Sequence, residues 1–112
     1  MEITQTQDGE VLIFAIRGKV DSQTSKTFED RLIPPIEQGN KKILVDFSEM
    51  DYISSAGLRV LLLAARKLSD GHGKIALCAL KPPIKNVFDI AGFSAVFPIF
   101  LSPTAALDEL RK

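Results

Sequence analysis

The stretch Val45–Leu68, VDFSEMDYISSAGLRVLLLAARKL, carries the strongest structural pattern in the chain. It begins within the apolar run Lys42–Phe47, which is typical of a buried strand. It ends in residues 56–68, where leucines and alanines form one broad helical stripe. The polar segment Ser48–Ser55 between them is interpreted as a loop. A strand followed by an amphipathic helix indicates a unit of an α/β fold.

Two strands and a helix are expected before this unit. Glu2–Gln7 and Glu10–Arg17 read as strands joined by the turn pair Asp8-Gly9, which predicts a hairpin ending at Gly18. The helix that follows can be capped by Asp21 or Ser22.

The expected first helix has an apolar face that is interrupted by proline. Its apolar residues recur every four positions and are Phe28, Leu32 and Ile36. Pro34-Pro35 lies within this pattern, and proline inside a helix removes a hydrogen bond and clashes with the preceding turn. The helix is therefore expected to stop or kink near Leu32.

Four further elements are predicted after the central helix. They are a buried strand Lys74–Leu80, a helix opened by Pro82 or Pro83 and stopping at Gly92, a short strand Ala95–Leu101, and a last helix capped by Ser102 or Thr104. Pro98 places the short strand at an edge or a bulge. The order β-β-α-β-α-β-α-β-α predicts an α/β fold with a mixed, largely parallel sheet of about four or five strands and about four helices. Residues 1–112 are interpreted as a single domain.

Composition narrows the possible functions. Lys+Arg and Asp+Glu each number 14, so the formal net charge is zero, which argues against nucleic-acid binding. The longest apolar stretches, such as Val60–Ala65, are too short to span a bilayer, so no membrane insertion is expected. No signal peptide is visible, which predicts a cytoplasmic location.

The residues available for catalysis are few. His72 is the only histidine and falls in a turn, and Cys78 is the only cysteine and falls in an apolar strand. A catalytic triad or a metal site needs several such groups together, so no catalytic residue, metal or cofactor is expected. Asp46, Glu49 and Asp51 are interpreted as surface residues.

Ser54-Ser55-Ala56-Gly57 stands out at the start of the central helix. One serine can act as the helix cap. The small residues after it are interpreted as leaving a serine hydroxyl uncovered so that another surface can approach. Free N–H groups and the positive end of the helix dipole would also stabilise a phosphate there.

These residues resemble a known family. Val45–Leu68 is similar to the signature of STAS domains (sulfate-transporter and anti-sigma-factor-antagonist domains), above all to the stand-alone bacterial anti-sigma factor antagonists. Arg17–Asp21 resembles the family's loop after the second strand. Pro83–Phe93 resembles its third helix and the residues that end it. The resemblance covers essentially the whole chain and implies the fold predicted above.

The resemblance also implies a phosphorylation switch. Aligned on Gly57-Leu58, the family's phosphate acceptor falls on Ser55, and Ser54 stands where the family usually has aspartate, so Ser54 is a second possible acceptor. The implied partners are an anti-sigma factor that is also a serine kinase of the histidine-kinase-like ATPase fold, and a serine phosphatase. Unphosphorylated protein would bind the kinase and free a sigma factor.

The implied docking face combines two loops with the start of the central helix. Its residues are Lys19, Asp21, Ser22, Ser54, Ser55, Ala56, Gly57 and Arg59. Two other functions are compatible with the sequence. One is a STAS regulatory subunit outside transcription, acting in secretion or signalling or associated with a transporter. The other is a small enzyme or phosphocarrier, which would depend on His72.

Overall fold

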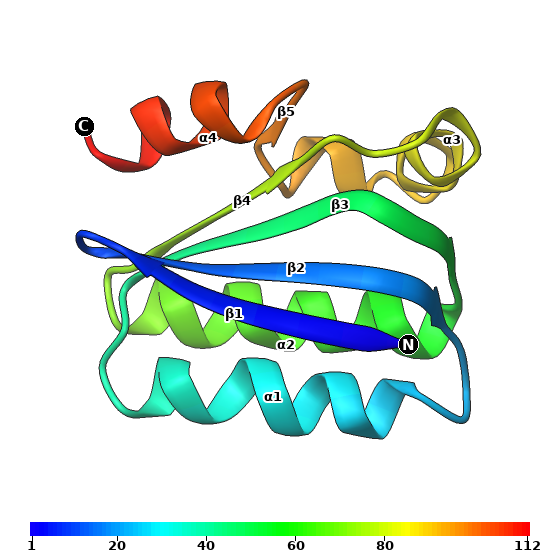
Figure 1. Ribbon diagram of the computed structural model, residues 1–112, viewed down its shortest axis with the longest axis horizontal. Coiled ribbons are helices and arrows are strands. Elements are labelled where there is room, and N and C mark those ends of the chain that lie inside the picture. Colours follow the sequence, from blue (N-terminus) through cyan, green and yellow to red (C-terminus); the bar gives the residue numbers. More distant parts are fainter.

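The computed structural model describes all residues from 1 to 112, and its centre is a five-stranded sheet in the order β1-β2-β3-β4-β5 (Figure 1). The strands are β1 (Glu2–Asp8), β2 (Val11–Val20), β3 (Lys42–Ile53), β4 (Lys74–Cys78) and β5 (Ile99–Phe100). β1 is antiparallel to β2, and all other pairs are parallel. The predicted hairpin and the mixed, largely parallel sheet are confirmed.

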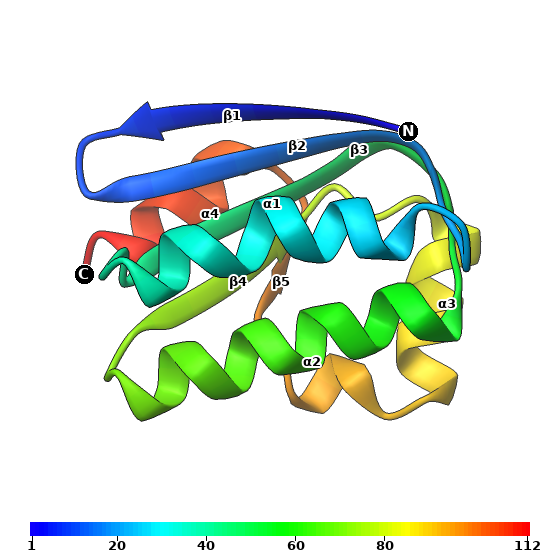
Figure 2. The ribbon, with the colours of Figure 1, turned by 90° about the horizontal axis from the view of Figure 1, so that it is seen from below.

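Four helices and one short 3₁₀ helix connect the strands in the predicted order. They are α1 (Ser25–Glu37), α2 (Ser55–Asp70), α3 (Pro82–Ile90), η1 (Phe93–Ala95) and α4 (Pro103–Leu110). α1 and α2 lie side by side beneath the sheet, and α4 lies on the opposite face (Figures 1 and 2). No helix combines the length and apolar character needed to cross a membrane.

Each face of the sheet buries its own apolar cluster. Alternate residues of β2 point to opposite faces, so Leu12 and Phe14 join the larger core with α1, α2 and α3, whereas Val11 joins the smaller core with α4. Phe47 of β3 and Phe88 of α3 meet edge to face with their ring centroids 5.8 Å apart. This contact places α3 beside the far half of β3.

The prediction that the first helix stops near Leu32 is wrong, because α1 continues through Pro34-Pro35. The two missing N–H groups would have bonded the carbonyls of Asp30 and Arg31. Both residues are exposed, so water can hydrate those carbonyls. The buried stripe continues across the prolines to Ile36, and its burial holds the last turn in place.

The predicted loop Ser48–Ser55 is also wrong, because β3 continues to Ile53. Beyond Asp46 it pairs with β2 alone, and two register shifts each place an extra residue in β3. These bulges give buried residues at a spacing of three instead of two: Phe47, Met50 and Ile53. The alternation expected of a strand was therefore absent from the sequence. β2 likewise passes through Gly18, at φ 94°, and ends at Val20.

The C-terminal part follows the predicted order with shorter strands. Of the expected strand Ala95–Leu101, only β5 is extended, and it lies at the sheet edge as Pro98 suggested. The strand predicted to reach Leu80 ends at Cys78, because Ala79 adopts a φ of 59°.

Candidate functional site

The predicted cap of α2 is confirmed and belongs to Ser54. Its backbone is extended, and its hydroxyl accepts a hydrogen bond from the Gly57 N–H at 3.3 Å. The Ser54 N–H donates to the Val20 carbonyl at 2.8 Å. The hydroxyl and the N–H of this half-buried residue are therefore both hydrogen-bonded, and they connect β2, β3 and α2.

Ser55 is the first residue of α2, and its side chain is exposed. Its hydroxyl makes no hydrogen bond within the chain. The neighbouring N–H groups at the helix start have no intrahelical partner, and the helix dipole is positive there. The arrangement can receive a negatively charged group on Ser55 without disturbing the cap.

Gly57 is small for a different reason from the one expected. It is buried, and a Cβ at this position would lie 2.8 Å from both Val20 Cγ1 and Ile53 Cγ1. Val20 and Ile53 are branched, buried side chains, so neither can readily move aside. Glycine is therefore needed for α2 to pack on the ends of β2 and β3, and it does not open space for a partner. The half-buried Ala56 lies beside it.

The loop between β2 and α1 is braced by its own side chains. The Asp21 carboxylate accepts hydrogen bonds from the Gln23 N–H at 2.9 Å and the Thr24 N–H at 3.0 Å, which together hold the pKa of Asp21 below its ordinary value. The Thr24 hydroxyl donates to the Lys19 carbonyl at 2.9 Å. The prediction that Asp21 or Ser22 caps the first helix is wrong, because the cap position of α1 is Thr24. Asp21 instead braces the turn before the helix, and Ser22 is exposed.

The structure brings the predicted docking residues to one end of the sheet. Val20 and Ile53 are register partners at the carboxyl ends of β2 and β3, so the Lys19–Ser22 loop lies next to Ser54-Ser55. Arg59 is exposed and lies one helical turn beyond Ser55. Binding sites of α/β folds commonly occupy the carboxyl ends of parallel strands.

Tyr52 belongs to the same surface and was missed from the sequence. Its side chain is 49% exposed, and its register partner on β2 is Lys19. An exposed tyrosine next to a docking loop is a common energetic anchor of interfaces. The sequence predicted a loop here and so gave no reason to include Tyr52 in the docking face. Tyr52 lies beside Lys19 because β3 stays extended through this segment.

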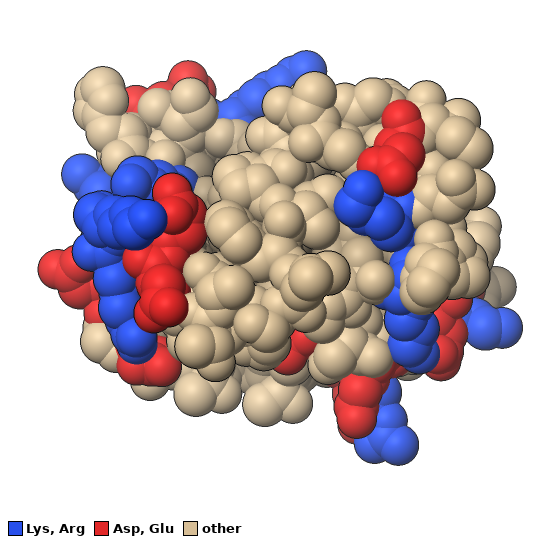
Figure 3. All heavy atoms as spheres, turned by 90° about the horizontal axis from the view of Figure 1, so that it is seen from above, with Lys and Arg blue, Asp and Glu red and all other residues tan.

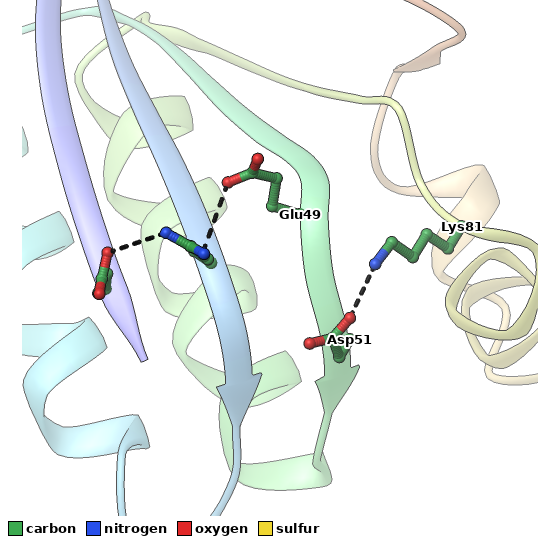
Figure 4. Close-up of polar contacts among 5 residues, drawn as sticks. Glu49, Asp51 and Lys81 are labelled. Carbon is green, nitrogen blue, oxygen red and sulfur yellow. Dashed lines mark hydrogen bonds and ion pairs between the residues drawn. The ribbon is translucent and has the colours of Figure 1, made fainter.

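Charged side chains of β3 beyond Asp46 form ion pairs with side chains of neighbouring elements (Figure 4). Lys81 Nζ lies 2.8 Å from Asp51 Oδ1, and its hydrogen bond and charge lower the pKa of Asp51. Arg17 lies between Glu49 and Glu2, at 3.9 Å and 3.7 Å. Glu49 and Asp51 are therefore exposed and paired with cations, in agreement with the surface interpretation.

The face opposite α1 and α2 has a different character. Charged side chains gather at two sides of this face and leave an uncharged surface between them (Figure 3). The segment Ile90–Leu107 contains no Asp, Glu, Lys or Arg, and Val96 and Leu101 within it are exposed.

Cys78 and His72 lie apart from this end of the sheet. Cys78 is fully buried, and burial, followed by the nearby Asp46 carboxylate, raises the pKa of its thiol to about 12. The thiol therefore stays protonated and is a poor nucleophile. His72 is exposed in the turn after α2, at the opposite end of that helix from Ser55.

The sequence model of the STAS domain matches residues 2–106. The chain belongs to the STAS domain family. A protein of Bordetella bronchiseptica that is named an anti-sigma factor antagonist, BtrV, is 39% identical over 106 residues, which are 95% of this chain and 91% of that protein. The family resemblance seen in the sequence is thereby confirmed.

Two solved structures show the same STAS fold. The crystal structure of an anti-sigma factor antagonist from Thermotoga maritima has a TM-score of 0.94 at 18% identity and covers 98% of this chain and 95% of its own. The Bacillus cell fate determinant SpoIIAA in its phosphorylated form has a TM-score of 0.77 at 19% identity, with 96% and 98% covered. At these identities the likeness concerns the fold alone.

Proposed function

We propose that this STAS protein is an anti-sigma factor antagonist that is switched off by phosphorylation of Ser55. The proposal rests on the different environments of the two serine hydroxyls. The Ser54 hydroxyl accepts a hydrogen bond as the helix cap, whereas the Ser55 hydroxyl is exposed and free. The name of the relative from Bordetella bronchiseptica supports the antagonist role.

The geometry explains how a phosphate on Ser55 changes binding without unfolding the protein. A phosphate adds about −1.5 to −2 charges at neutral pH. At the first position of α2 that charge meets free N–H groups and the positive end of the dipole. The helix therefore tolerates it, while a partner on the same surface meets new charge and bulk that must be desolvated.

The proposed partner is an anti-sigma factor that is also a serine kinase of the histidine-kinase-like ATPase fold, and a serine phosphatase reverses the reaction. The partner surface comprises the loop residues Lys19, Asp21 and Ser22, the junction residues Ser54, Ser55 and Ala56, and Tyr52 and Arg59. Gly57 supports this surface from beneath through its contacts with β2 and β3. The protein acts by binding in the cytoplasm.

The acceptor is tested by mapping the phosphate. Immobilised wild-type protein retains its anti-sigma kinase from extract without ATP, and the retained kinase is identified and purified. Incubation with this kinase and ATP is expected to modify wild type and Ser54→Ala, and to leave Ser55→Ala unmodified. Phosphate found on Ser54 alone would reverse the assignment of the two serines.

The switch is tested by binding to the same kinase. Ser55→Ala is expected to bind with and without ATP, because it cannot be modified. Wild type is expected to be released when ATP is added. If Ser55→Ala is also released by ATP, Ser55 is not the switch.

A further inference from the structure

The outer face of α1 and α2 is uncovered and grooved. Seen from below, the two helices lie side by side and no other segment crosses in front of them (Figure 2). One cavity of about 430 Å³ and another of about 410 Å³ lie along them, and both are lined by Glu29 and Leu63. The two cavities therefore adjoin each other, and together they are called here the α1–α2 groove.

The walls of the α1–α2 groove carry opposite charges. The wall from α1 contributes Glu29, Asp30 and Glu37, and the wall from α2 contributes Arg59, Arg66 and Lys67. Between the walls lie the apolar side chains of Ile33, Pro34, Val60, Leu62 and Leu63. The groove thus has an acidic side, a basic side and an apolar floor.

Half of these charges have no partner within the chain. Lys67 Nζ lies 3.1 Å from Glu37 Oε2, which closes one end of the groove. Asp30 pairs with Lys26, which lies outside the groove, at 2.8 Å. Glu29, Arg59 and Arg66 form no ion pair, although charged side chains elsewhere on the surface form seven. Their charges are available to an opposing surface.

The two helices are parallel, because each returns the chain between parallel strands of one sheet. The Lys67–Glu37 contact shows that a residue of α1 lies level with the residue 30 positions later on α2. Glu29 and Arg59 have the same separation and line the same cavity. The acidic and basic walls therefore face each other at matching heights.

We propose that the α1–α2 groove is the docking surface for a second copy of this chain. A two-fold axis parallel to the helices, lying in the plane of the interface, sets α1 of one copy over α2 of the other in the same direction. Glu29 then lies opposite the Arg59 of the other copy, at the same height. A partner for this groove needs a basic row, an acidic row and an apolar strip between them, and the same face of another copy carries all three.

The expected dimer is weak and depends on salt. Helices of 13 and 16 residues are about 20 and 24 Å long, so the two-helix face is small for a stable interface. Exposed charge pairs are screened at high ionic strength. The dimer also covers Arg59, so, if the proposed function holds, self-association competes with the kinase for that end of α2.

Sedimentation equilibrium of the purified protein over a range of concentrations and salt tests the proposal directly. Wild type is expected to dimerise reversibly at low salt. Arg59→Glu/Arg66→Glu makes both walls predominantly acidic, and Glu29→Lys/Glu37→Lys makes both walls predominantly basic, so each variant alone is expected to self-associate at least about tenfold more weakly. Mixed together, the two variants are expected to associate again, because each supplies the charge that the other lacks.

The control is Lys41→Glu/Lys74→Glu, which changes the net charge by the same amount as the arginine variant and uses exposed lysines outside the groove. It is expected to dimerise like wild type. A monomeric wild type at low salt and high concentration, or variants that fail to associate when mixed, would overturn the proposal.

Circular dichroism confirms that each variant is folded before it is compared. The single variant Arg66→Glu and the salt titration of wild type provide the test if a double variant unfolds. No kinase is present in these measurements. Their outcome is therefore independent of whether Ser55 is the switch.

Discussion

The starts of α2 and α4 use the same cap: Ser54 and Ser102 each accept a hydrogen bond from the N–H three residues later, at 3.3 and 3.2 Å. The residue after the cap differs. In α2 it is Ser55, with a free and exposed hydroxyl, whereas in α4 it is Pro103, which has no hydroxyl. The serine cap is therefore a structural device common to both helices.

The surroundings of the two helix starts differ more than the caps do. Behind the cap of α2 lies the buried Gly57, packed against Val20 and Ile53 at the carboxyl ends of two parallel strands. The corresponding residue of α4, Ala105, is exposed. What distinguishes the candidate site is thus its position beside the braced loop after β2, and four predictions test this distinction.

The largest effect is expected from adding side-chain volume behind each cap. Gly57→Val places atoms where a Cβ alone would lie 2.8 Å from two buried side chains, and overpacking of this kind costs about 1–3 kcal/mol or more. Ala105→Val at the exposed position should cost less than about 1 kcal/mol. Urea denaturation of both variants measures the difference, and equal losses would show that Gly57 is not constrained by packing.

A negative charge in the first turn of α2 or of α4 is expected to affect the stability of the fold and the binding of the kinase differently. Ser55→Asp and Thr104→Asp should each leave the fold intact or stabilise it by about 0.3–1 kcal/mol through the helix dipole. Only Ser55→Asp is expected to weaken kinase binding, by at least about tenfold, because only that residue lies on the proposed docking surface. Isothermal titration calorimetry of both variants checks this. Equal binding by the two would place the docking surface elsewhere.

Removing the two caps should have similar effects. Ser54→Ala and Ser102→Ala each remove a hydroxyl that accepts one helical N–H, which typically costs about 1 kcal/mol. Thermal denaturation of the two single variants measures the loss. If Ser54→Ala costs much more, the Ser54 hydroxyl has a further role at the β3–α2 junction.

The turn before α1 extends the comparison to a bracing side chain that can be protonated, Asp21. The folded-state pKa of Asp21 is lowered, so its contribution to stability is present above its unfolded pKa of about 3.9 and is lost as pH falls through the lower folded value. Asp21→Asn should therefore be slightly less stable than wild type near pH 6, with a smaller difference near pH 3. Urea midpoints at both pH values test this. A difference that grows in acid would contradict it.

Much of the fold and part of the candidate site could be predicted because their signals are local. Apolar periodicity over residues 56–68 indicated α2. A hydroxyl before a helix indicated a cap at Ser54 or Ser55 and another at Ser102 or Thr104, and the structure assigns these caps to Ser54 and Ser102. Turn residues around Gly9 indicated the hairpin of β1 and β2, although the turn is Gly9-Glu10 and not the predicted Asp8-Gly9. Each of these depends on a few neighbouring residues and their hydrogen bonds.

The sequence by itself determined the order of elements and a serine-capped start of α2, and the structure decided that the cap is Ser54 and that Ser55 follows it. The tertiary structure alone decided that β3 runs on to Ile53, that α1 passes through Pro34-Pro35 and that Gly57 is an interior residue. In each case the deciding contacts involve residues distant in sequence. β2 supplies a pairing partner for the bulged part of β3. Burial beneath the sheet outweighs the hydrogen bonds that α1 loses at its prolines, and Val20 excludes any side chain at position 57. Periodicity within one segment carries no information about such neighbours, because they are set by how the segments pack together.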